Sequence, residues 1–127
     1  MDTTRCLKRL KKFKTKKNIT LNFYEGYSLI HIDVKENEIP VAWLTIDNNY
    51  NMKICKTKEC FGENHTDEHI IRTIVKLAKF LKLNEVYGRI YIENDNCTNL
   101  FKTFKFKISE QFDKKEKTIK VKLKTSN

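Results

Sequence analysis

A long amphipathic helix stands between two strand-like segments near the middle of the sequence. Residues 66–81 place their apolar side chains on one broad stripe, with basic side chains on the opposite side. The stretch MKICKT (52–57) before this helix and the stretch EVYGRIYIE (85–93) after it have the apolar pattern of strands. Because a helix that joins two strands of one sheet makes a crossover, the segment predicts a parallel pair with a helix packed on it.

Further strands are expected before this unit. Residues 18–34 (NITLNFYEGYSLIHIDV) are typical of two strands broken near Glu25 and Gly26. Residues 41–46 (VAWLTI) form a third apolar run, and we expect its Trp43 to lie in the core. The first half of the domain is therefore a series of short strands joined by turns.

A second helix and two more strands are expected after the unit. The stretch DNCTNLFKTF (95–104) predicts a short helix that begins at Asp95 or Asn96. Two antiparallel strands follow, each with apolar side chains inward and lysines toward solvent. The predicted order is α-β-β-β-β-α-β-α-β-β, and the predicted fold class is α+β, with helices flanking one twisted mixed sheet.

The length of 127 residues suits a single domain. We expect residues 1–17 to form a basic helix or arm and residues 18–127 to form the domain. No apolar run is as long as a membrane span, and no signal-like segment begins the chain, so we expect a cytoplasmic protein without membrane contact. Four cysteines are too few for a disulfide scaffold, and reduced thiols are expected.

The net charge of +10 favours anionic partners such as nucleic acid or an acidic protein surface. Of the 26 basic residues 22 are lysine, which does not favour the bidentate contacts that arginine makes. Lysine, isoleucine and asparagine are abundant together, as coding by A/T-rich DNA alone would produce. The charge therefore permits such a partner without identifying it.

From Leu29 to Leu123 the order of elements resembles the Gcn5-related N-acetyltransferase (GNAT) family. MKICKT matches the family's fourth strand, residues 61–83 match its phosphate-binding loop and helix, and IYIENDNCTNLFKTFKF (90–106) matches its last conserved segment. The helices that this family usually carries between its first two strands are missing. The resemblance implies an acetyl-CoA-dependent N-acetyltransferase acting on a small-molecule or peptide amine, with an unknown oligomeric state.

The resemblance also implies which residues lie at the site. Those matched to the acetyl-CoA site are Cys55, Lys56, Thr57, Gly62, Glu63, Asn64, His65, Thr66, Asp67, Asn94 and Phe101. The candidate general bases are the acidic residues near strand ends, namely Glu93, Asp47 and Glu59.

Three positions depart from the family pattern. The loop glycines fall on or near His65 and Asp67, where a Cβ and a carboxylate replace a bare backbone. The family tyrosine that protonates the leaving thiolate aligns with Phe101, and a glycine aligns with Lys105. The alternative hypothesis is therefore a catalytically inactive domain of this fold, whose lysines bind nucleic acid or an acidic partner.

The loop also allows a metal-site interpretation. Cys55, Cys60, His65 and His69 have the spacing C-x4-C-x4-H-x3-H, and thiolates with imidazoles suit tetrahedral zinc. Structural zinc sites normally use C-x2-C, however, and Cys55 falls within a predicted strand. The acidic residues of the loop suit the start of a helix equally well, so we predict no metal site.

Overall fold

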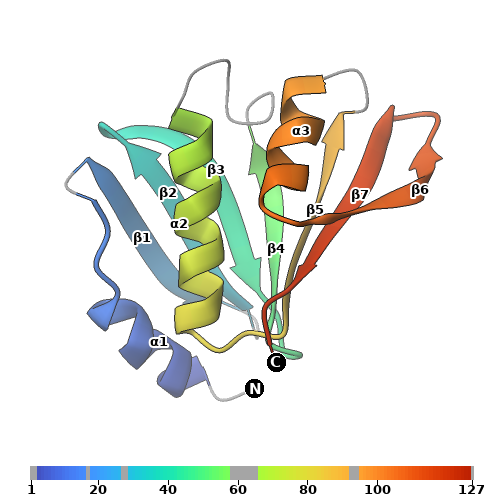
Figure 1. Cartoon of the computed structure of the whole chain (residues 1–127). Helices are drawn as coiled ribbons and strands as arrows, with labels where there is room; N and C mark the ends of the chain where they lie inside the picture. The colour runs from blue at the N-terminus through green and yellow to red at the C-terminus, as the bar shows by residue number, and fades with distance from the viewer. Residues whose placement is uncertain (1–2, 17, 27–28, 58–65, 92–94, 127) are drawn as a thin grey trace.

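The computed structural model describes residues 3–16, 18–26, 29–57, 66–91 and 95–126 (Figure 1). Its elements, in chain order, are α1 (Thr3–Lys12), β1 (Ile19–Gly26), β2 (Leu29–Glu36), β3 (Ile39–Ile46), β4 (Asn51–Thr57), α2 (Thr66–Phe80), β5 (Glu85–Tyr91), α3 (Asp95–Thr103), β6 (Lys107–Asp113) and β7 (Thr118–Lys124). This order is the predicted one, and each predicted strand and helix is present.

The seven strands form one mixed sheet in the order β1-β2-β3-β4-β5-β7-β6. Neighbouring strands are antiparallel except β4 and β5, which are parallel and joined through α2, as predicted. Only two residues separate β1 from β2, so no helix lies between the first two strands. The sequence interpretation of a shortened α+β fold is therefore confirmed.

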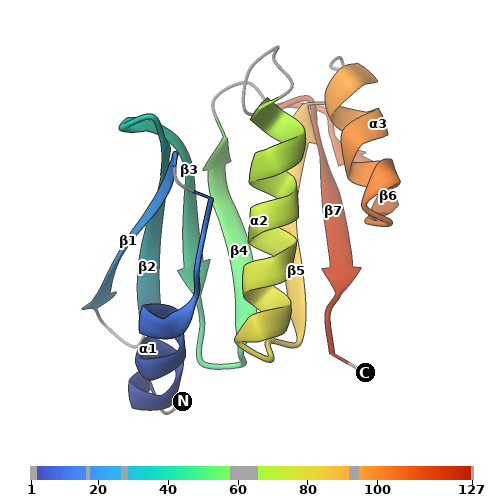
Figure 2. The same ribbon diagram turned by 60° about the vertical axis from the view of Figure 1, so that its left-hand side comes forward.

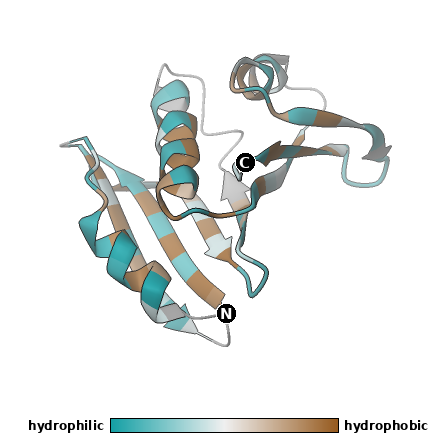
Figure 3. Cartoon of the chain, turned by 60° about the horizontal axis from the view of Figure 1, so that its bottom comes forward, coloured by the Kyte–Doolittle hydropathy of each residue, from teal (hydrophilic) through white to brown (hydrophobic). Residues whose placement is uncertain are grey.

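Helices cover one face of the sheet. Figures 1 and 2 show α1, α2 and α3 on the same side. The apolar stripe of α2, including Ile71 and Leu77, is fully buried against sheet residues such as Leu44 and Val86. The strands alternate between apolar and polar residues along their length (Figure 3), and the apolar residues face these helices. The buried apolar residues of strands and helices form one core.

The basic N-terminal segment is part of this core. Helix α1 buries Cys6 and Leu10 completely, and the ring of Phe13 contacts that of Phe80 on α2 at a centroid distance of 5.3 Å. Lys16 Nζ lies 3.3 Å from His69 Nδ1 on α2. Helix α1 thus packs on the same face as α2.

None of the three described helices lies on the opposite face, which we call the open face. Strand pairing and alternation assign to it Tyr24, His31, Asp33, Lys35, Trp43, Thr45, Lys53, Cys55, Glu85, Tyr87, Arg89, Tyr91, Lys107, Asp113, Thr118, Lys120, Lys122 and Lys124. Trp43 is only half-buried there, so its expected place in the core is wrong. Its strand does alternate, but the side chains facing away from the helices have no described layer over them.

Two lysines end helices in the left-handed conformation. After α3, Lys105 has φ 66°, with Phe106 N donating to Phe101 O at 3.0 Å and Lys105 N donating to Lys102 O at 2.9 Å. These two bonds make a Schellman motif, in which glycine is the preferred residue. Lys82 ends α2 in the same manner with φ 57°. Lys105 therefore makes a left-handed turn at the position that the resemblance matches to a glycine.

We expect Lys105→Gly to raise the free energy of unfolding by about 0.5–1 kcal/mol. A left-handed non-glycine residue costs about 1–2 kcal/mol, and the greater freedom of glycine in the unfolded chain offsets part of the gain. Chemical denaturation measures the change. Lys102→Gly is the matched control because Lys102 lies in the last turn of α3, where glycine should lower stability. A loss of stability in both variants would contradict the interpretation of Lys105.

Candidate functional site

The two parallel strands separate at their carboxyl ends. Strands β4 and β5 pair from Asn51 and Glu85 as far as Ile54 and Gly88, and among the described residues their pairing ends there. Beyond that point each strand stays paired with its outer neighbour: β4 with β3 as far as Thr57, and β5 with β7 as far as Tyr91. The sheet therefore opens between two strands that are each held from outside.

A β-bulge in β4 lies at the point of separation. Trp43 of β3 pairs with Lys56, whereas the next residue, Leu44, pairs with Ile54, so Cys55 is the extra residue. A bulge bends its strand and increases the local twist. The bulge therefore lies where the pairing of β4 with β5 ends.

A close backbone contact holds the two strands together just before they separate. A Cβ placed on Gly88 would lie 3.2 Å from Ile54 Cβ and 3.3 Å from Ile54 O, closer than ordinary packing allows. Glycine therefore lets β5 approach β4 at the last paired position. The apex of the opening is defined by Gly88 on one strand and by Ile54, next to the bulge, on the other.

The amino terminus of α2 lies at the same end of the sheet as the opening. The helix begins at Thr66, after the carboxyl end of β4, and runs back along the sheet (Figure 1). A helix amino terminus carries partial positive charge and unsatisfied N–H groups, which suit an anionic ligand. An anionic group would therefore be favoured at this end of the sheet, near the start of α2.

The open face carries polar groups close to the bulge. Cys55 is an exposed free thiol, and its Sγ lies 3.4 Å from Thr45 Oγ1. Burial, with smaller contributions from the negative charges of Asp47, Cys55 and Glu85, raises the pKa of Tyr87 above its usual value of 10.0. Tyr87 immediately precedes Gly88, and on the open face Lys120 Nζ lies 5.3 Å from its ring centroid.

The predicted site residues fall into three groups. The backbones of Cys55, Lys56 and Thr57 line the separated part of β4, and Thr66 and Asp67 begin α2. The structure thus brings these two segments to one end of the sheet. The predictions that fall outside the described residues concern Glu59, Gly62, Glu63, Asn64, His65, Glu93 and Asn94.

Two predicted residues lie in other surroundings. Phe101 is 1% exposed and packs edge-on against Phe106, with ring centroids 4.9 Å apart. Asp47 lies in the turn between β3 and β4, where its Oδ1 accepts hydrogen bonds from the backbone N–H groups of Asn49 and Asn51. This turn is at the opposite end of β4 from the bulge, so the structure does not bring Asp47 to the opening.

The four-ligand zinc arrangement does not form. Cys55 lies on the open face, whereas His69 lies on α2, which covers the other face, and contacts Lys16. The sheet separates these two side chains, so they cannot bind the same metal ion. The described residues contain no cluster of metal-binding side chains.

Cys97 is disulfide-bonded, so the expectation of reduced thiols is wrong for this residue.

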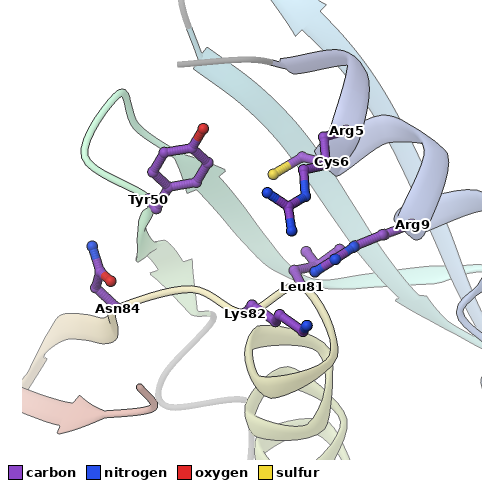
Figure 4. A pocket seen from close by; sticks show the side chains of 7 residues that line it. All are labelled: Arg5, Cys6, Arg9, Tyr50, Leu81, Lys82 and Asn84. Carbon is purple, nitrogen blue, oxygen red and sulfur yellow. The ribbon is translucent and has the colours of Figure 1, made fainter. Parts of the chain in front are cut away.

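A pocket of about 250 Å³ lies at the other end of the sheet (Figure 4). Its lining comes from α1, from Tyr50 just before β4, and from the segment between α2 and β5: Arg5, Cys6, Arg9, Tyr50, Leu81, Lys82 and Asn84. Because Tyr50 and Asn84 precede β4 and β5, the pocket is at the amino ends of the two strands. It is therefore separate from the opening at their carboxyl ends.

Sequence reasoning missed Gly88 and Tyr87. An isolated glycine within a strand pattern is a signal of close backbone approach, and EVYGRIYIE contains one. The position of the bulge has no such signal, because it depends on how β3 and β4 pair.

None of the described helices has the length and apolar character needed to cross a membrane.

No family model and no curated protein matches this sequence. Solved structures do match its fold. The Campylobacter jejuni N-acetyltransferase PseH aligns with a TM-score of 0.57 at 19% identity, over 97% of this chain and 77% of that chain. The ribosomal-protein-S18-alanine N-acetyltransferase from Escherichia coli aligns with a TM-score of 0.59 at 8% identity, over 81% and 73%. A GNAT family acetyltransferase from Elizabethkingia anophelis with acetyl-CoA bound aligns with a TM-score of 0.57 at 10% identity, over 86% and 99%.

Proposed function

Because the chain has the fold of the Gcn5-related N-acetyltransferases, we propose that it is an acetyl-CoA-dependent N-acetyltransferase. The observation that carries this proposal is the opening between β4 and β5, whose pairing ends at Ile54 and Gly88 in the described part of the two strands. Structures of similar fold include PseH in complex with acetyl coenzyme A and the acetyl-CoA-bound protein from Elizabethkingia anophelis. The acceptor in this proposal is an amine of a small molecule or a peptide.

The pantetheine arm of acetyl-CoA would lie along the separated end of β4. Its amide groups can pair with the backbone of Cys55, Lys56 and Thr57, as an added strand pairs with a sheet edge. The pyrophosphate would then meet the amino terminus of α2, at Thr66 and Asp67. The family pattern adds five further residues to the proposed cofactor site: Gly62, Glu63, Asn64, His65 and Asn94.

The proposed reaction is direct acetyl transfer. The acceptor nitrogen attacks the thioester carbonyl, a C–N bond forms, the C–S bond breaks, and the thiolate of CoA leaves and takes up a proton. Backbone N–H groups of β4 would stabilise the carbonyl oxygen as negative charge develops on it. Glu93 is the first candidate to accept the proton of the amine, with Glu59 as the alternative. Asp47 is left out of the proposal because its turn lies at the other end of β4.

The leaving thiolate needs a proton source other than Phe101. That side chain has no proton to give and is buried in the core. Water that reaches the opening can supply this proton. Tyr87 is next to Gly88 in β5, but burial raises the pKa of its phenol, which makes it a weaker acid. We therefore propose water as the donor, with Tyr87 as the alternative.

A thermal melt with and without acetyl-CoA tests the binding step. At about a hundred times its Kd the ligand should add about 2.7 kcal/mol to the free energy of unfolding, a shift of several degrees. Asp67→Asn should enlarge the shift, because it removes a negative charge from the first turn of α2 near the proposed pyrophosphate. Glu110→Gln removes the same charge from exposed β6 and should leave the shift unchanged.

Release of CoA thiol in the presence of primary amines then tests the transfer step. A shift in the melt followed by thiol release supports the enzyme. No shift at millimolar acetyl-CoA would overturn the proposal and favour the alternative, an inactive domain of this fold that binds an acidic partner. A shift without thiol release for any amine would restrict the proposal to cofactor binding.

A further inference from the structure

A continuous row of side chains crosses the whole open face. Cross-strand pairs link Tyr24 to His31, His31 to Thr45, Thr45 to Lys53, Lys53 to Tyr87, Tyr87 to Lys122 and Lys122 to Lys107. This row includes one residue from each of the seven strands. With adjacent strands about 4.8 Å apart, it extends over about 29 Å.

Aromatic rings are concentrated on this face. Tyr24 is 55% exposed and stacks on His31, with ring centroids 5.0 Å apart and an interplanar angle of 10°. Tyr91 is also 55% exposed, and Trp43 and Tyr87 are half-buried. Rings displayed on the surface of a sheet provide stacking platforms for the bases of single-stranded nucleic acid.

The same face is strongly basic. Its basic residues are Lys35, Lys53, Arg89, Lys107, Lys120, Lys122 and Lys124, and its acidic residues are Asp33, Glu85 and Asp113. Lysines also lie beside the rings, as where Lys120 Nζ is 5.3 Å from the ring centroid of Tyr87. Cations that alternate with rings match the alternating phosphates and bases of a nucleic-acid strand.

We propose that the open face binds single-stranded nucleic acid. Lysine side chains would neutralise phosphates while bases stack on the rings of Tyr24, Trp43 and Tyr91. An acidic polypeptide would pair with the lysines but would not stack on these rings. The face is accessible because the described helices all pack on the other side of the sheet.

Trp43 makes this binding directly measurable. It is the single tryptophan of the chain and lies on the open face. Titration with short single strands of oligo-dT and oligo-U should quench its fluorescence to saturation, and the affinity should fall as salt is raised. The two oligonucleotides show whether the sugar of RNA is needed. The same titration with polyglutamate tests the alternative partner, an acidic polypeptide.

Matched double variants distinguish the effect of lysines on the open face from the effect of the net positive charge of the protein. Lys53→Gln with Lys122→Gln removes two charges from the row, and Lys76→Gln with Lys79→Gln removes two from the exposed side of α2. For the row variant, the slope of log affinity against log salt should become shallower by about 1.4, since single strands release about 0.7 counterion per neutralised phosphate. The α2 variant should keep the wild-type slope.

A second pair of variants tests stacking. Tyr24→Leu removes an exposed ring from the face and should weaken binding about fivefold or more, with the salt slope unchanged. Phe80→Leu removes an exposed ring from α2 and should have no effect. A melt of each variant confirms that it is folded.

The proposal is overturned by any of three results. Absence of quenching would mean that no strand binds, and equal losses in both lysine pairs would mean that the charge acts without a site. Equal quenching by polyglutamate would identify an acidic polypeptide as the partner. The acetyl-CoA melt is independent of each of these results, so failure here leaves the proposed enzyme function untouched.

Discussion

Gly88→Ala is expected to lower the free energy of unfolding by about 1–3 kcal/mol. The added methyl group would lie 3.2 Å from Ile54 Cβ and 3.3 Å from Ile54 O. The second of these atoms belongs to the backbone of β4, which cannot move aside without breaking its pairing with β3. Overpacking of this kind costs energy through strain and shifted backbone.

The same variant is expected to weaken acetyl-CoA binding, because Gly88 sets the apex of the proposed cofactor opening. Chemical denaturation and the acetyl-CoA melt measure the two effects separately. Gly26→Ala is the matched control: its new Cβ would meet His31 only at 3.8 Å, an ordinary contact. We expect this control to change stability by no more than about 0.5 kcal/mol. Equal effects of the two variants would contradict the claim that the close approach of Gly88 to Ile54 requires glycine.

Phe101→Ala is expected to cost about 3–5 kcal/mol, the largest effect that we predict. The ring is 1% exposed and packs edge-on against Phe106 within the core under α3. Phe104→Ala, in the turn that follows α3, should cost less because Phe104 is only partly buried. Its ring lies under the Arg72 guanidinium, with 5.8 Å between Arg72 Cζ and the ring centroid. Urea denaturation of the two variants gives the comparison.

Phe101→Tyr distinguishes a core residue from a lost catalytic one. A hydroxyl group added at this buried position lowers the free energy of unfolding by about 1–3 kcal/mol unless it finds a hydrogen-bond partner. We therefore expect lower stability and no gain in acetyl transfer. If Phe101→Tyr instead kept full stability and accelerated transfer, position 101 would belong to the site.

The elements of the fold could be predicted because their signals are local. The apolar stripe of α2 and the alternation along β7 each depend on residues close together in the sequence. Trp43 shows where this reasoning ends. Its strand could be recognised, but whether its side is covered depends on where the helices pack, and that is set by distant parts of the chain.

Two segments of the candidate site could be placed from the sequence for the same reason. The end of β4 and the start of α2 follow one another in the chain, so a local pattern brings them together. The apex does not arise in this way, because Gly88 and Ile54 meet only through the pairing of two strands. Lys105 shows a further limit: a lysine keeps the left-handed turn in which glycine was expected, so a changed residue does not imply a changed backbone.

The short ladder between β4 and β5 also bears on how the molecule opens. Strands β1 to β4 form consecutive antiparallel pairs, whose contacts are local, whereas β5 pairs with β4 through a parallel ladder of four residue pairs among the described residues. Local pairing forms readily, and a ladder between distant segments forms late and is the natural line of partial unfolding. A ligand held by both β4 and β5 would bridge the two halves. We therefore expect slower amide hydrogen exchange along β5 and β7 when the opening is occupied.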